Sequence, residues 1–223
     1  MSHERFVMRG SGPSLSLAST GPRSAATSSR PAPDVDVYFS ADVETDGPIP
    51  GEFSMLSFAL VYAGRYDGTE FVRPADYTTS FEVSLKPISE RFEQEALDVN
   101  GLDRDELLRT GTDPSVAMAR AAEWIRTHTA GGTPVLVAYP LSFDWTWLYW
   151  YFVRFTGQSP FNHSRCLDLK TAIAVRGRRP VSGSGHDRLP DALKSSLPHT
   201  HRALDDAIEQ ADILANLFAW DGK

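Results

Sequence analysis

The sequence predicts a single α/β domain in which helices flank a mixed β-sheet. Three segments in the first part of the chain have the alternating or apolar pattern of strands, and helical patterns follow them. A short, almost wholly apolar segment then lies between two helical segments, as expected for a strand buried on both faces of a sheet. Strands that come first as a group and then alternate with helices are typical of a mixed sheet.

Residues 1–33 are predicted to precede the domain, which then covers residues 34–223. This first segment is rich in Ser, Ala, Pro, Gly and Arg, and Glu4 is its one acidic residue. A segment with so little apolar surface cannot offset the entropy cost of ordering, so we expect it to be disordered. Its composition also resembles a transit peptide for organelle import, and a plain extension of the chain is the alternative.

The first predicted strand carries two acidic side chains on one face. Apolar and polar residues alternate from Val35 to Glu44, which is the period of a strand. Because alternate residues project from the same face, Asp42 and Glu44 point together. Neighbouring carboxylates repel each other unless a cation lies between them, and this pair suits Mg²⁺ or Mn²⁺. Taken alone, the pattern also fits a solvated strand edge.

The following segments supply the other elements of the first half. Residues 47–50 (Gly-Pro-Ile-Pro) interrupt the strand pattern. Residues 53–63 and 76–85 have the pattern of two further strands, and residues 91–98 and 114–129 that of two helices. Three strands and two helices are therefore expected within residues 35–129.

The predicted buried strand, Pro134–Tyr139, is followed by Asp144. Functional residues of α/β proteins gather at the carboxyl ends of sheet strands, which is where Asp144 falls. A helix is predicted over residues 144–156, so stabilisation of the helix dipole is the alternative role of this aspartate. A loop rich in Gly, Arg and Pro is predicted at 176–190.

The last predicted helix, residues 202–219, places two adjacent aspartates on different faces. At about 100° per residue, Asp206 lines up with Ile213 and Leu217, toward packed surface. A carboxylate is rarely buried without a metal, a partner or a shifted pKa, so the pattern favours Asp206 as the functional acid. Asp205 instead lines up with a stripe that we expect to be solvated: Glu209, Asp212 and Asn216.

Two histidines lie just before this helix. His201 stands five residues before Asp206, at or just before the first helical turn. A histidine titrates near neutral pH and can take a proton from an attacking water. We predict this general-base role for His201, with His199 as the rival candidate and a surface role as the alternative for either.

Composition restricts the partners and the location of the protein. The formal net charge is −7, whereas proteins that grip long duplex nucleic acid usually present a basic face. Any contact with nucleic acid should therefore be short and local, with bound metal ions supplying positive charge.

The single cysteine, Cys166, excludes an internal disulfide framework and a Cys-based zinc site. It favours a reducing compartment, which we take as the cytoplasm. No apolar run approaches the roughly 20 residues that span a bilayer, so no membrane association is expected.

Together, the acids and the histidine resemble the motifs of a known family. Asp42-Val43-Glu44-Thr45 resembles the first exonuclease motif of the DnaQ-like superfamily, and Phe143-Asp144 resembles the second. His201–Ala207 is similar to the third motif, H-x-A-x-x-D-A, of its histidine (DEDDh) branch. The tyrosine branch has Tyr where this chain has Arg202. The resemblance covers residues 35–219, with one departure: the His-Asn pair common in the second motif is missing.

The resemblance implies a ribonuclease H-like fold and a 3′–5′ exonuclease that uses two Mg²⁺ or Mn²⁺ ions. By position, Asp42, Glu44 and Asp206 would bind the first ion, and Asp42 would also reach the second. Asp144 would assist as a ligand or through a water, and His201 would activate the nucleophile. The alternatives are a non-catalytic binding module on the same fold and a metal-dependent phosphohydrolase of free nucleotides.

Four residues are predicted to contact the substrate, the 3′ end of single-stranded DNA or short RNA. Met55 follows the first motif, where relatives wedge or stack the terminal base, and core packing is its alternative. Trp145 is predicted to stack on a base. Arg178 and Arg179 are predicted to guide phosphates, with a solvated loop as the alternative. Whether the chain forms a homodimer stays open.

Overall fold

The computed structural model describes residues 34–197 and 200–223, and every structural statement below refers to these residues. The predictions for residues 1–33 and for His199 lie outside them.

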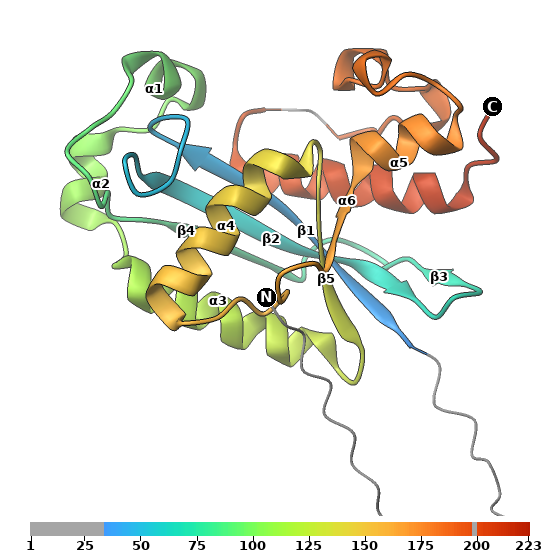
Figure 1. Cartoon of the computed structure of the whole chain (residues 1–223), viewed down its shortest axis with the longest axis horizontal. Coiled ribbons are helices and arrows are strands. Elements are labelled where there is room, and N and C mark those ends of the chain that lie inside the picture. Colours follow the sequence, from blue (N-terminus) through green and yellow to red (C-terminus); the bar gives the residue numbers. More distant parts are fainter. Residues whose placement is uncertain (1–33, 198–199) are drawn as a thin grey trace, which may run out of the picture. The chain divides into compact units, whose positions relative to one another are not determined.

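One mixed sheet forms the centre of the described chain (Figure 1). Its strand order is β3-β2-β1-β5-β6, and β4 pairs with the same strand, β2, as β3 does. β1 is antiparallel to β2 and parallel to β5, and β6 continues the parallel side. The predicted mixed sheet is confirmed. Its six strands are β1 (Asp36–Thr45), β2 (Met55–Tyr66), β3 (Phe71–Val72), β4 (Ser80–Ser84), β5 (Thr133–Ala138) and β6 (Cys166–Asp168).

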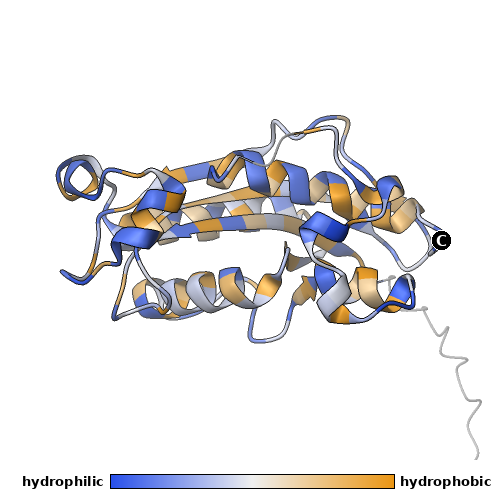
Figure 2. Ribbon diagram, turned by 90° about the horizontal axis from the view of Figure 1, so that it is seen from above, coloured by the Kyte–Doolittle hydropathy of each residue, from blue (hydrophilic) through white to orange (hydrophobic). Residues whose placement is uncertain are grey.

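Helices cover both faces of this sheet, as Figures 1 and 2 show. The odd-numbered residues of β1, such as Phe39 and Val43, pack in one apolar core with α3 and α4, while Tyr38 packs in a second core with α5 and α6. Because successive strand residues alternate between faces, Asp42 and Glu44 lie on the α6 side of the sheet. The helices are α1 (Gln94–Asn100), α2 (Arg104–Thr110), α3 (Pro114–Thr129), α4 (Leu141–Thr156), α5 (Leu169–Arg176) and α6 (Ala203–Ala219), with 3₁₀ turns at Val181–Gly183, His186–Arg188 and Asp191–Leu193.

The sequence prediction missed several short elements: α2, α5, β3 and β6. Each has eight residues or fewer, which is too short for an apolar period to stand out from the flanking loops. The strand expected at residues 76–85 is shorter, at Ser80–Ser84. The helix expected from residue 144 begins three residues earlier, at Leu141. Within residues 34–197 and 200–223, no helix has the length and apolar character needed to cross a membrane.

The carboxyl end of β1 is open along one edge. β5 pairs with β1 only as far as Ser40, whereas β2 accompanies β1 to Thr45. The last residues of β1 therefore have no strand partner on the β5 side. Backbone amides at such an edge are available to side chains from other elements.

The turn after β1 is held by a buried network. Asp46, which is fully buried, accepts hydrogen bonds from the Ser54 amide and from Nε of Arg104, the latter at 3.0 Å. Asn100 at the end of α1 donates to the carbonyl of Thr45 at 2.9 Å. At Gly47 any β-carbon would lie 2.1 Å from the ring of Phe53, so this tight turn requires glycine. The strand end that carries Glu44 is thus fixed by α1 and α2.

Candidate active site

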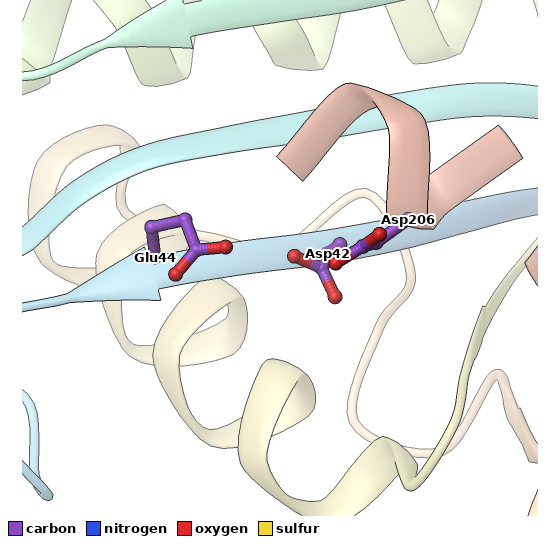
Figure 3. A group of neighbouring side chains, drawn as sticks. All are labelled: Asp42, Glu44 and Asp206. Atoms are coloured by element: carbon purple, nitrogen blue, oxygen red, sulfur yellow. The ribbon is translucent and has the colours of Figure 1, made fainter. Parts of the chain in front are cut away.

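Three of the predicted acids converge at the open end of β1. Asp42 and Glu44 project from β1, and Asp206 projects toward them from the first turn of α6 (Figure 3). Each offers a carboxylate oxygen, and these oxygens all lie within 4.8 Å of one another. Residues 164 positions apart in the sequence are therefore brought to one point, where a cation could bind all three.

Asp206 is oriented by the backbone that precedes its own helix. Its two carboxylate oxygens accept hydrogen bonds from the amides of Thr200 (2.8 Å) and His201 (3.0 Å). Both amides precede the helix and its N-cap, Arg202, so this first-turn acid also fixes the segment that leads into α6. Asp206 is only 2% exposed, as its packed face predicts. Asp205, by contrast, is half-buried and accepts a hydrogen bond from the Thr200 hydroxyl at 2.9 Å.

The expectation of a solvated stripe on α6 is wrong. Glu209 is 5% exposed and bonds Nε2 of His186 at 2.8 Å. Asp212 is 7% exposed and bonds the side chain of Arg73. Helical period shows which residues share a face, but it cannot show that a distant loop and the segment after β3 pack over that face. A buried acid on α6 is therefore not by itself a sign of the catalytic site.

Asp144 belongs to the site but lies outside the group of three. It is buried in the first turn of α4, and its Oδ1 accepts the backbone amide of Val43 at 3.1 Å. That amide lies in the part of β1 that extends beyond β5, so the open strand edge explains the contact. One oxygen of Asp144 is thus directed at the backbone between Asp42 and Glu44.

Burial and repulsion by neighbouring carboxylates raise the pKa values of Asp42, Glu44 and Asp144. Burial, and then the charge of Asp206, raises the pKa of Glu44 to about 7. Burial is also the main cause that raises the pKa of Asp144 to about 8, while its backbone hydrogen bonds act in the opposite direction. The pKa of Asp42 is well above its usual range, first through burial and then through its acidic neighbours. Carboxylates crowded in this way are stabilised in the ionised form by a divalent cation, so the donor set fits a metal centre.

Gln210 is a residue of the site that the sequence prediction missed. Its Nε2 donates to Oδ1 of Asp42 at 3.1 Å, and this bond lowers the pKa that burial raises. Gln210 lies four residues after Asp206, and residues at this spacing share a helix face. That spacing was the available signal.

The side chain of His201 is exposed, and its backbone has a positive φ of 56°. The hydrogen bond from its backbone amide to the carboxylate of Asp206 keeps the residue at the edge of the acidic group. The general-base role stays a prediction.

Among the four predicted substrate contacts, Met55 needs correction. It is fully buried in the core, and its backbone amide donates to the Tyr151 hydroxyl at 2.7 Å, so the core-packing alternative applies. Trp145 is half-buried and stacks on Tyr149, with ring centroids 5.3 Å apart. Phe143, which directly precedes Asp144, is 41% exposed and offers more aromatic surface than the sequence alone suggested.

Arg178 is exposed and Arg179 is half-buried, both just after α5. Their contact with a substrate stays a prediction.

No family model matches the chain. A curated relative from Escherichia coli, the 3′-5′ DNA exonuclease Cap18, is 33% identical over 181 residues, which are 81% of this chain and 90% of the relative. The chain belongs to the DnaQ-like (DEDDh) 3′–5′ exonucleases. The predicted family is confirmed, and the enzyme is a metal-dependent 3′–5′ exonuclease.

Solved structures support the fold of this exonuclease. The nuclease domain of 3′hExo, a DEDDh family member bound to rAMP, has a TM-score of 0.61 at 11% identity and covers 83% of this chain and 92% of that one. The cell-death related nuclease 4 (CRN-4) has a TM-score of 0.60 at 17% identity and covers 84% of this chain but only 64% of that one. The predicted ribonuclease H-like fold is confirmed.

Proposed function

We propose that the exonuclease removes nucleotides from the 3′ ends of single-stranded DNA with two bound Mg²⁺ or Mn²⁺ ions. The observation that carries this proposal is the convergence of Asp42, Glu44 and Asp206 within 4.8 Å, with Asp144 beside them. The name of the Cap18 relative, a DNA exonuclease, supports DNA as the substrate. The cytoplasmic location stays a prediction, and so does a domain that covers residues 34–223.

The distribution of charge supports a local grip on a phosphate backbone. Residues 165–202 contain eight basic and three acidic residues, although the whole chain has a net charge of −7. This segment leads directly into Thr200 and His201, whose amides hold Asp206. A single-stranded nucleic acid whose 3′ end lies at the carboxylates would therefore continue over this basic segment.

Aromatic side chains beside Asp144 support a single-stranded substrate, in which the bases at the 3′ end are unpaired. Phe143 is 41% exposed, and Trp145 is half-buried on the same turn of α4. Stacking on such rings contributes about 1–3 kcal/mol per base and requires bases that are not already paired. We assign Phe143 and Trp145 as the stacking candidates, with Arg178 and Arg179 as phosphate contacts.

Each acid has a distinct role in the proposed mechanism. Asp42, Glu44 and Asp206 face one another and would hold the first ion, and Asp42 and Asp144 would hold the second. When bound, such ions stabilise the negative charge on the attacking and leaving oxygens of phosphodiester hydrolysis. The amides of Thr200 and His201 hold Asp206 in place before substrate arrives.

We assign His201 as the general base that takes a proton from the attacking water. His201→Ala should lower kcat by about 100-fold, within the range for loss of general acid–base catalysis, and should leave Mn²⁺ affinity unchanged. The rival variant, His199→Ala, should retain most of the rate. Single-turnover kinetics and calorimetry measure both quantities, and the opposite ranking of the two variants would exchange their roles.

A time course on matched end-labelled substrates tests the proposed substrate. Single-stranded DNA should be shortened stepwise from its 3′ end, faster than RNA of the same sequence, and chelator should stop the reaction. RNA differs from DNA chiefly by its 2′-hydroxyl, so the comparison of the two rates tests whether the enzyme discriminates by this group. Faster degradation of RNA would reassign the substrate, and hydrolysis of free nucleotides alone would support the phosphohydrolase alternative.

A further inference from the structure

Gln210 joins the helix and the strand that carry the acids. It is 5% exposed, and its Nε2 donates to Oδ1 of Asp42 at 3.1 Å, across 168 positions of sequence. It lies one helical turn after Asp206, so α6 presents one acid and the hydrogen-bond partner of another acid on the same face. The side-chain amide of Gln210 thus links the helix that carries Asp206 to the carboxylate of Asp42.

Packing alone does not explain a glutamine at this position. The neighbouring buried residues of α6 are mainly apolar, and they include Ala207, Ala211 and Leu214. The Oε1 atom of Gln210 is buried and has no hydrogen-bond partner within the described part of the chain. A buried polar atom without a partner costs about 1–3 kcal/mol, which offsets most of what the single bond to Asp42 contributes. A methionine of similar length would stabilise the fold about equally well.

The side-chain amide of Gln210 does, however, restrict the orientation of Asp42, which is a proposed metal ligand. The terminal torsion of an aspartate is broad, so a free carboxylate samples many orientations. The Nε2 donor that Gln210 fixes on Oδ1 selects one orientation of this carboxylate. Partners of this kind typically contribute 10–100-fold to metal affinity or activity.

We propose that Gln210 is a positioning residue that holds the Asp42 carboxylate in the orientation required for metal binding. The proposal rests on the metal site assigned under the proposed function. It concerns the chain's own residues and adds no ligand to that site. Its consequence is that loss of the amide weakens metal binding without weakening the fold.

The test compares Gln210→Met with the wild-type full chain. Mn²⁺ binding, measured by calorimetry, should weaken by about 10–100-fold, and the electron paramagnetic resonance spectrum of bound Mn²⁺ should change. The free energy of unfolding in chelator should stay within about 1 kcal/mol of wild type, because the unpaired Oε1 is removed together with the hydrogen bond and water can replace the lost donor at the half-buried Asp42. Asn216→Leu is the matched control on the same helix, since Asn216 bonds loop carbonyls at 3.4 Å, and it should leave Mn²⁺ binding unchanged.

The outcomes separate this proposal from the proposed function. Equal Mn²⁺ affinity in Gln210→Met and wild type would overturn the positioning role and leave the metal site standing. A wild-type chain that binds no Mn²⁺ would overturn the metal site itself. Weaker binding together with a loss of unfolding free energy above about 3 kcal/mol would show a structural role instead.

Discussion

Asp206→Asn should abolish exonuclease activity while the fold is retained, and the same change at its neighbour Asp205 should leave most of the activity. Asp206 points at Asp42 and Glu44, within 4.8 Å. Asp205 instead accepts a hydrogen bond from the Thr200 hydroxyl. Loss of a metal ligand removes several kcal/mol of transition-state stabilisation, so kcat/KM should fall by roughly 1000-fold or more.

The fold should tolerate this change because the asparagine side chain keeps one oxygen that can accept a hydrogen bond from the backbone amide of Thr200 or His201. The lost hydrogen bond costs about 1 kcal/mol, and removal of a charge from a repelling group acts in the opposite direction. Steady-state kinetics on single-stranded DNA and thermal unfolding measure both effects. Equal losses of activity from the two asparagine variants would show that the assignment of the α6 faces is wrong.

The metal-free exonuclease should lose stability as the pH rises from 5 to 9. Glu44 has an ordinary pKa of 4.5 and a folded-state pKa of about 7, and that of Asp144 rises from 3.8 to about 8. A carboxyl group with a raised folded-state pKa holds its proton more tightly in the native state than in the unfolded state. Its contribution to stability is therefore fully present below the unfolded-state pKa and is lost as the pH rises through the folded-state value. For Glu44 alone this loss is roughly 3 kcal/mol.

Divalent metal should reverse this dependence of stability on pH. Metal binds the ionised carboxylates, so Mg²⁺ or Mn²⁺ should stabilise the protein more at pH 8 than at pH 6. A concentration 100-fold above Kd corresponds to about 2.7 kcal/mol of stabilisation. Urea unfolding across this pH range, with chelator and with metal, gives both curves. Glu44→Gln should flatten the metal-free curve, and a metal-free stability that stays constant or increases toward pH 9 would contradict the assigned pKa shifts.

The sequence by itself was sufficient for the properties that depend on local period and motif. Strand alternation placed Asp42 and Glu44 on one face, and helical period separated Asp206 from Asp205. The apolar period of α3 gave its bounds to the residue, because a helix of 16 residues repeats its pattern several times. The order of the three motifs was also enough to indicate the family and, through it, the chemistry.

Only the tertiary structure decided which surfaces meet. Glu209 and Asp212 have the spacing of a solvated stripe, yet distant segments bury them, and Met55 is enclosed by the core. Asp144 turns one oxygen to the amide of Val43 because β5 leaves that edge of β1 open, and Gln210 on α6 reaches Asp42 on the face of the sheet that α6 covers. The period of a helix or strand fixes the direction of a side chain relative to its own element, whereas burial and pairing depend on the elements that long-range packing brings against it.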